Sequence, residues 1–281
     1  MKSQSLPTLR DAWAGCRQCD LGVYRQEMDG EFVFGEGYTR GVMFIGEGPT
    51  KEDDISGTPF SGKTGNIIRV VAKKLGIPAY FTNLVTCRSC TQAHTSDGQP
   101  IFYANRRTGV QEAKINDVPP IQTQIDACLS RLHSEIYLVD PHVIVAMGEV
   151  ACNALASGGT IKIPRDQGKQ RLEISIPGML QMPSLTEKKH VWSRKVHGVI
   201  SLPTITNTIQ YKMIPTVNMQ WLASHWRDRS PGSPVEMFVK DMKLVRDIYN
   251  RRIYEVDGIH PEERASLVED DIISEVMTDG S

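Results

Sequence analysis

The stretch that decides the fold is residues 46–65, with the sequence GEGPTKEDDISGTPFSGKTG. A short apolar run at residues 42–45 leads directly into it, and a helix-like run at residues 67–75 follows it. Glycines at the end of a strand allow backbone N–H groups to approach a ligand closely, as phosphate- and base-binding turns require. The stretch therefore predicts a ligand-binding turn between a β-strand and an α-helix.

Apolar, β-branched runs alternate with amphipathic segments along the chain. The strand-like runs are residues 42–45, 80–85, 142–147 and 213–217, and the helix-like segments are residues 65–75, 121–139, 149–156 and 235–252. Strands that alternate with helices predict βαβ units and a mainly parallel sheet. Ligands bind such sheets at the carboxyl ends of the strands, where we expect the glycine-rich turn to lie.

The length of 281 residues suits one domain with insertions. Two polar segments, residues 91–119 and 157–203, interrupt the alternation, and we expect them to be insertions in one domain spanning residues 1–252. Residues 253–281 form an acidic tail with nine acidic residues and one basic residue, Arg264, so its net charge is −8. Because the net charge of the whole chain is −1, residues 1–252 carry a net charge of about +7. A basic body with an acidic tail is compatible with a polyanionic partner such as DNA.

The composition also bears on location. No apolar run approaches the roughly 18 residues of a membrane helix, and the first residues, MKSQSLPTLRDAW, lack the apolar core of a signal peptide. Six cysteines without a secretory segment favour thiols or metal ligands over disulfides. We expect a cytoplasmic protein without a membrane partner, and we expect a monomer.

Two C-x2-C pairs, Cys16/Cys19 and Cys87/Cys90, predict a metal site with four thiolate ligands. Structural zinc and an iron–sulfur cluster both accept such ligands, and the residues themselves do not choose between the two. Cys128 is available in place of Cys90 as the fourth ligand.

Residues 57–64, GTPFSGKT, match the phosphate-binding pattern G-x4-G-K-[ST] of P-loop NTPases. The context argues against this interpretation, because a P-loop begins directly at a strand end and residues 51–56 are acidic and polar here. Asp140 would have to hold magnesium, yet it precedes a strand instead of following one. We therefore expect no nucleotide cofactor, and a P-loop NTPase stays as an alternative of another class.

Five motifs occur in order along the chain. They are FGEG at residues 34–37, FIGEGP at 44–49, GTPFSGKTG at 57–65, TNLVTCR at 82–88, and Cys128 followed by PHVIVAMGEVA at 141–151. Together they resemble the iron–sulfur (family 4) branch of the uracil-DNA glycosylase superfamily. The resemblance implies a three-layer α/β/α fold with a central, mainly parallel four-stranded sheet. It also implies a monofunctional DNA N-glycosylase that flips a base out of DNA, hydrolyses its N-glycosidic bond and leaves an abasic site, with uracil as the default base.

The resemblance further implies a [4Fe–4S] cluster bound by Cys16, Cys19, Cys87 and Cys128, with structural zinc as the alternative. Cys90 is then not a ligand of the cluster. In this family the cluster is structural and ties the N-terminal segment to the DNA-facing loops.

The matched motifs imply a role for each site residue. Phe60 would stack on the flipped base, Asn83 would read its Watson–Crick edge through its amide, and Gly48 belongs to the same base-binding turn. Glu47 would stand near the sugar, where it would position water and balance the developing positive charge. The alternatives are a core role for Phe60, a turn cap for Asn83, and a hydrogen bond from Glu47 to turn amides.

The last motif departs from the family. Residues 215–222, PTVNMQWL, are its best counterpart, with Asn218 in place of the family histidine and Met219 in place of a proline. Asn218 can donate a hydrogen bond to the leaving base but brings no charge, and a lost preorganised donor costs roughly 3–4 kcal/mol of barrier. Because of this departure, a glycosylase that removes a modified pyrimidine, as in phage DNA metabolism or anti-phage defence, is an alternative to a uracil glycosylase. An inactive DNA-binding module is a further alternative.

Basic side chains are expected to grip the DNA backbone. The candidates are Lys63 in the glycine-rich turn, and Arg165 and Lys169 in a basic segment at residues 162–195. Each phosphate contact would steepen the salt dependence of binding by about one unit.

Overall fold

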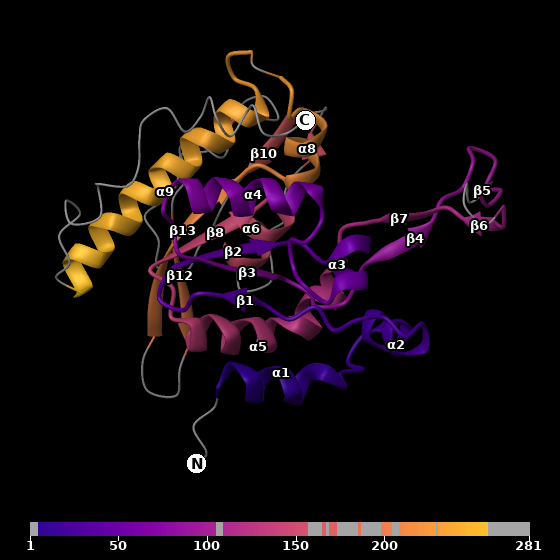
Figure 1. The fold of residues 1–281 in the computed structure, drawn as a ribbon, viewed down its shortest axis with the longest axis horizontal. Coiled ribbons are helices and arrows are strands. Elements are labelled where there is room, and N and C mark those ends of the chain that lie inside the picture. The colour runs from indigo at the N-terminus through magenta and orange to yellow at the C-terminus, as the bar shows by residue number, and fades with distance from the viewer. Residues whose placement is uncertain are drawn as a thin grey trace.

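A six-stranded sheet forms the centre of the molecule in a computed structural model (Figure 1). The structure describes residues 5–104, 109–156, 165–166, 169–172, 185–186, 198–203, 208–228 and 230–257. In spatial order the strands of the sheet are β1 (Glu36–Gly37), β3 (Ala79–Asn83), β2 (Val42–Gly46), β8 (Val143–Met147), β13 (Thr208–Thr216) and β12 (Gly198–Pro203). The middle four run parallel, and β1 and β12 are antiparallel edges. The predicted four-stranded parallel sheet is confirmed, with two unpredicted edge strands.

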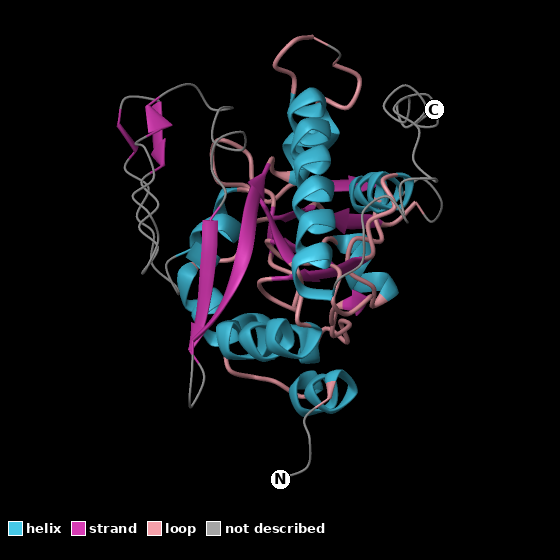
Figure 2. Ribbon diagram, turned by 90° about the vertical axis from the view of Figure 1, so that its left-hand side faces the viewer, coloured by secondary structure: helices cyan, strands magenta, loops and turns pink. Residues whose placement is uncertain are grey.

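Helices cover both faces of this sheet (Figures 1 and 2). They are α1 (Leu6–Ala14), α2 (Asp20–Glu27), α3 (Lys51–Ser56), α4 (Lys63–Lys74), α5 (Gln122–Val139), α6 (Glu149–Ala156), α8 (Met219–Ser224) and α9 (Pro234–Asp257). None of the described helices is both long and apolar enough to cross a lipid bilayer.

Alternation of side chains along β2 explains the layers. Met43 and Ile45 belong to a buried cluster with residues of α5 and α6, whereas Val42 and Phe44 pack with residues of α4, α8 and α9. Successive side chains of a strand point to opposite faces, so a strand that is apolar throughout must be covered on both sides. The predicted three-layer α/β/α fold is confirmed.

The strand order creates a switch point at the carboxyl edge. The chain places β3 on one side of β2 and then crosses to place β8 on the other side. Open α/β sheets bind ligands where the order reverses in this way. The ends are in register there, with Gly46 opposite Asn83 and Met147 opposite Thr216.

A buried ion pair supports the end of β3. The side chains of Arg131 and Glu135 on α5 are both fully buried and bond to each other. Arg131 donates to the carbonyl oxygens of Asn83 and Leu84 at 2.8 and 2.7 Å, and Glu135 accepts from the hydroxyl of Tyr80 at 2.9 Å. Because both charges find partners, the pair fixes the backbone at the strand end.

The first predicted insertion forms an antiparallel ribbon in two tiers. The inner tier pairs β4 (Cys90–Gln92) with β7 (Ile115–Asp117), and the outer tier pairs β5 (Phe102–Ala104) with β6 (Gln111–Ala113). The ribbon projects from the α/β core (Figure 1).

The second predicted insertion, residues 157–203, is only partly separate from the core. It contributes a small sheet of β9 (Arg165–Asp166), β10 (Lys169–Leu172) and β11 (Leu185–Thr186). Its last six residues form β12, which pairs with β13, so they belong to the central sheet. At the other boundary, α9 continues to Asp257, past the expected end at residue 252, and residues 258–281 lie outside the described chain.

Candidate functional site

A cavity of about 190 Å³ lies at the carboxyl edge of the sheet. Drug-sized ligands occupy roughly 300–1,000 Å³, so this cavity suits one nucleobase better than a nucleoside triphosphate. Its walls come from the turn after β2, the start of α4, the end of the ribbon and the start of α8, and they include Glu47, Gly48, Phe60, Lys63, Asp117, Val118, Met147, Asn218 and Met219. Five predicted site residues therefore meet at one place: Glu47, Gly48, Phe60, Lys63 and Asn218.

Glu47 and Asn218 form a pair across the switch point. The Asn218 Nδ2 donates to Glu47 Oε1 at 2.9 Å. The Asn218 Oδ1 accepts from the backbone N–H groups of Gln220 and Trp221 and so caps α8. These bonds orient the Asn218 amide and direct one of its N–H bonds at Glu47.

Gly148 makes room for this pair. It directly follows β8 and has φ +90°, a conformation that side chains rarely adopt. A Cβ at this position would lie 2.7 Å from Glu47 Oε1 and 3.1 Å from Asn218 Nδ2. Gly148 belongs to the motif at residues 141–151, but no role was predicted for it, although a glycine directly after a strand is a signal for close approach.

The surroundings of Glu47 disfavour its charge. Burial raises the pKa of Glu47 above its ordinary value, the hydrogen bond from Asn218 lowers it, and the nearby charge of Glu149 raises it. Burial is the largest of these effects, so the carboxyl group holds its proton more tightly than a solvated glutamate does.

Asn83 has a buried side chain without a partner. Only 1% of the residue is exposed, and neither Oδ1 nor Nδ2 has a hydrogen bond. A Cβ at Gly46 would lie 2.4 Å from Asn83 Oδ1 and 3.2 Å from Phe60 Cζ, so these two predicted residues are neighbours across Gly46. An unsatisfied buried amide costs about 1–3 kcal/mol, which makes Asn83 the most informative polar group of the site.

Phe60 is both a core residue and a wall of the cavity. The residue is 1% exposed and its ring packs against Phe81 at 5.3 Å between centroids, yet it also lines the cavity. Its φ of +58° is unusual for a non-glycine residue. Gly65 allows this conformation, because a Cβ there would lie 2.4 Å from Phe60 O.

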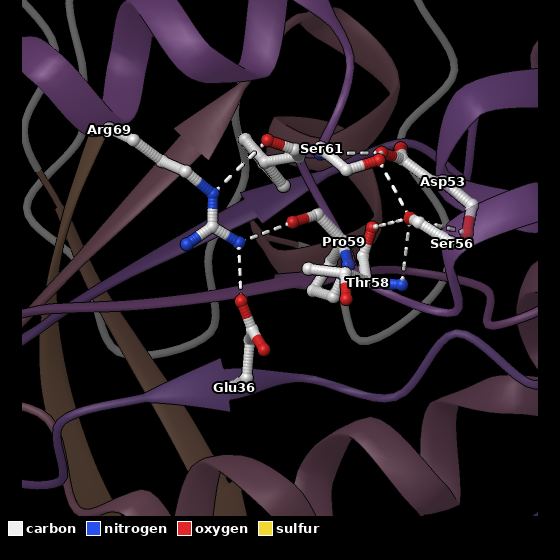
Figure 3. Close-up of polar contacts among 8 residues, drawn as sticks. Glu36, Asp53, Ser56, Thr58, Pro59, Ser61 and Arg69 are labelled. Atoms are coloured by element: carbon white, nitrogen blue, oxygen red, sulfur yellow. Dashed lines mark hydrogen bonds and ion pairs between the residues drawn. The ribbon is translucent and has the colours of Figure 1, made fainter.

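Two side chains hold the Phe60 loop from opposite sides (Figure 3). Arg69 donates from Nε to Phe60 O at 3.1 Å and from Nη2 to Pro59 O at 2.5 Å. Asp53 accepts from the N–H of Ser61 at 2.7 Å and from its hydroxyl at 2.8 Å. No sequence pattern pointed to Arg69, whose partners are two backbone carbonyls and the carboxylate of Glu36 at 2.7 Å.

The P-loop match has the wrong setting for a phosphate site. Residues 57–62 follow helix α3, not a strand, and Gly62 is the N-cap of α4. Asp140 is the left-handed C-cap of α5. Both findings agree with the sequence argument against an NTPase.

Met219 is a wall residue that the sequence analysis noted only as a departure from the family. Its terminal methyl group lies 3.4 Å from the position of a Cβ on Gly46. Met219 lines the cavity, whereas Asn83 is not among the described lining residues. The Met219 methyl group and the Asn83 amide oxygen therefore both approach Gly46.

The predicted cluster ligands gather beside α2. Cys87 and Cys128 are buried in one apolar cluster, and Cys19 packs against it. Burial raises the pKa of the Cys87 thiol to about 11, with Arg25 and Cys128 close enough to affect it. Cys16 lies against α2, because a Cβ on Gly22 would be 2.7 Å from Cys16 O.

Cys90 has a different environment from this group. Burial raises its pKa, and the nearby charges are those of Arg88, Asp117 and Asp54. Among the residues that the structure describes, no group of three or more potential ligands is close enough to hold a metal ion in the present side-chain positions.

The DNA-contact candidates have different outcomes. Lys63 lines the cavity as the first residue of α4. Arg165 and Lys169 lie on β9 and β10, where the structure describes no side chains, so their role stays a prediction.

The fold and the site define a class: a three-layer α/β protein with a nucleobase-sized cavity at the switch point of its parallel sheet. The family model described as the Uracil DNA glycosylase superfamily matches residues 33–243. Because this match covers well over half of the chain, the protein belongs to the uracil DNA glycosylase superfamily.

Similar curated proteins are Type-4 uracil-DNA glycosylases. The one from Pyrobaculum aerophilum is 29% identical over 154 residues, which cover 53% of this chain and 64% of that protein. The one from Thermotoga maritima is 30% identical, over 54% of this chain and 67% of that protein. The one from Sulfurisphaera tokodaii is 25% identical, over 71% of this chain and 73% of that protein. The chain thus spans slightly under two thirds of the first relative, and the predicted family resemblance is confirmed.

Proposed function

We propose that this protein is a DNA glycosylase that takes one flipped base, by default uracil, into the cavity and hydrolyses its N-glycosidic bond. The observation that carries the proposal is the unpaired amide of Asn83 beside Phe60. An amide offers both an acceptor and two donors, which suits the Watson–Crick edge of a pyrimidine. Flipping a base costs a few kcal/mol, and the bonds that Asn83 lacks in the free protein help to offset that cost.

Glu47 is the proposed catalytic carboxylate. Breaking the glycosidic bond builds positive charge on the sugar, and an ionised Glu47 at the cavity wall would stabilise it and orient a water molecule. Asn218 acts as a positioning residue in this scheme, because its amide is held by the α8 N-terminus and points at Glu47. Lys63 at the cavity and Arg165 and Lys169 on β9 and β10 would contact DNA phosphates.

Release of free uracil from single- and double-stranded oligonucleotides, without magnesium or nucleotide, tests the proposal. We expect abasic sites without strand cleavage. Glu47→Gln should lower the single-turnover rate about 10²–10⁴-fold, while Glu27→Gln on the surface of α2 should leave it unchanged. A wild-type protein that binds these oligonucleotides but releases no base would refute the enzyme and leave a binding module.

An iron–sulfur cluster bound by Cys16, Cys19, Cys87 and Cys128 is part of the proposal. The donor set fits it chemically, because Cys19, Cys87 and Cys128 lie at one apolar cluster, Cys16 lies against α2 beside them, and Cys90 lies among other charges. When bound, such a cluster would cross-link α2 to the ends of β3 and α5 and so contribute stability.

Iron analysis and visible absorbance of the purified protein test this part. We expect a brown protein, whereas zinc would give no colour. Cys128→Ser should lose iron and have a lower melting temperature. Cys90→Ser should keep its iron and its melting temperature. A colourless protein with bound zinc would show that the site holds zinc instead of a cluster. Iron retained in Cys128→Ser but lost in Cys90→Ser would show that Cys90, and not Cys128, is the fourth ligand.

A further inference from the structure

The ribbon of β4–β7 is rooted in the rim of the cavity. Asp117 and Val118, at its end, line the cavity. Asp117 Oδ1 accepts from Arg88 Nε at 2.6 Å, and Asp117 Oδ2 accepts from the N–H of Lys51 at 3.3 Å, at the start of α3. Asp117 therefore ties the end of β7 to the segment before β4 and to the start of α3.

The outer tier of the ribbon carries large apolar side chains that are exposed to solvent. Phe102 is 53% exposed, Tyr103 is 42% exposed and Val110 is 58% exposed. Among the described strands, β5 and β6 pair only with each other. An isolated two-stranded sheet is marginally stable in water, so a ribbon of this kind gains from a partner.

The two aromatic rings lie on opposite faces of this tier. Phe102 pairs with Ala113, whose methyl group is too small to cover the ring. Tyr103 pairs with Glu112 and donates its hydroxyl proton to that carboxylate at 2.9 Å. Neighbouring residues of a strand alternate between faces, so each face presents one ring to solvent.

The composition of this segment favours nucleic acid over an apolar partner. The sequence of residues 101–114 contains Arg106, Arg107 and Lys114 against the single acid Glu112. Exposed aromatic rings among basic residues are typical of surfaces that bind single-stranded nucleic acid by stacking and charge. Continuity with the cavity rim places such a strand beside the flipped base.

We propose that the outer tier, β5 and β6, binds the unpaired DNA strand that flanks the flipped base, with Phe102 and Tyr103 stacking on its bases. This inference rests on the proposed function only in taking DNA as the substrate. It makes single-stranded DNA, or DNA opened around the target, the preferred form of the substrate.

Fluorescence anisotropy with labelled oligothymidine tests the inference without any base excision. One probe is long enough to reach from the cavity to the ribbon, and the other is too short. The double variant Phe102→Ala/Tyr103→Ala should bind the long probe about tenfold more weakly, since each base stack contributes about 1–3 kcal/mol. The short probe should bind as before, and the salt slope should not change because no charge is removed.

The matched control is Tyr38→Ala, which removes an aromatic residue that is 70% exposed near the opposite edge of the sheet. It should bind both probes normally. Unchanged binding of the long probe by the double variant, equal loss on both probes, or self-association of the wild type that the double variant abolishes would each overturn the inference. Normal probe binding together with no release of uracil would instead reject the proposed function alone.

Discussion

Two buried polar side chains at the end of β3, those of Arg131 and Asn83, differ in whether they have hydrogen-bond partners. Arg131 on α5 donates to Glu135 and to the carbonyl oxygens of Asn83 and Leu84. The side-chain amide of Asn83, whose own backbone carbonyl accepts one of these bonds, has no hydrogen-bond partner. A buried group with partners stabilises the fold, whereas one without them destabilises it until a ligand supplies them. The contrast separates the scaffold from the site.

Breaking the scaffold should give the largest effect. Arg131→Ala leaves Glu135 buried without its ion-pair partner and should lower the free energy of unfolding by about 3–5 kcal/mol. Arg40→Ala removes a half-exposed pair with Asp140 at 3.1 Å and should cost about 1 kcal/mol or less. Urea unfolding of both variants measures the difference, and similar losses would contradict the structural role of Arg131.

Changing the unpaired amide should separate activity from stability. Asn83→Ala removes the proposed base-reading group and should lower the rate of uracil release about 10²–10³-fold. Its free energy of unfolding should fall by less than that of Arg131→Ala, because no hydrogen bond of the folded protein is lost. Single-turnover assays and urea unfolding check the two parts. A normal rate in a folded Asn83→Ala variant would remove Asn83 from the site.

The pH dependence of the reaction should follow the neighbours of Glu47. An ionised Glu47 is required in the proposal, so the rate should rise with pH through its raised pKa. Asn218→Ala removes a bond that lowers this pKa and should shift the rise to higher pH, while Glu149→Gln should shift it to lower pH. Shifts in the same direction would refute the assignment of the titrating group to Glu47.

Raising the pH should favour the reaction by ionising Glu47, but the same ionisation should lower the stability of the folded protein. Because burial raises its pKa in the folded state, Glu47 stabilises the fold below its unfolded pKa, and this contribution is lost as the pH rises through the folded pKa. Glu47→Gln should therefore flatten the pH dependence of the free energy of unfolding in that window. Urea titrations across pH measure this, with Glu27→Gln as the control.

Met219 should give the smallest effect. Its side chain lines the cavity, so Met219→Ala should enlarge the cavity and raise the rate on a pyrimidine with a 5-substituent, relative to uracil, by about tenfold. Met28→Ala, at an exposed position, should leave this ratio unchanged. Competition between the two bases in one oligonucleotide pool gives the ratio directly, and an unchanged ratio would show that Met219 does not select the base.

Local patterns were sufficient for the elements and for part of the site. The parallel strands and their helices follow from apolar periodicity, and α6 has the predicted bounds. The glycine-rich turn correctly brought Glu47, Gly48 and Phe60 to one cavity. The edge strand β12 was missed because strands at an edge pair with a neighbour that no short-range pattern identifies.

The sequence by itself determined the alternation of strands and helices, the glycine-rich turn and the superfamily, because these depend on residues close together in the chain. Only the tertiary structure decided that Asn218 bonds to Glu47, 171 residues away, that Gly148 leaves room for both, and that Met219 and Asn83 both approach Gly46. Those contacts exist because the strand order brings the ends of β2, β3, β8 and β13 to one edge, and that order is a property of the packed sheet.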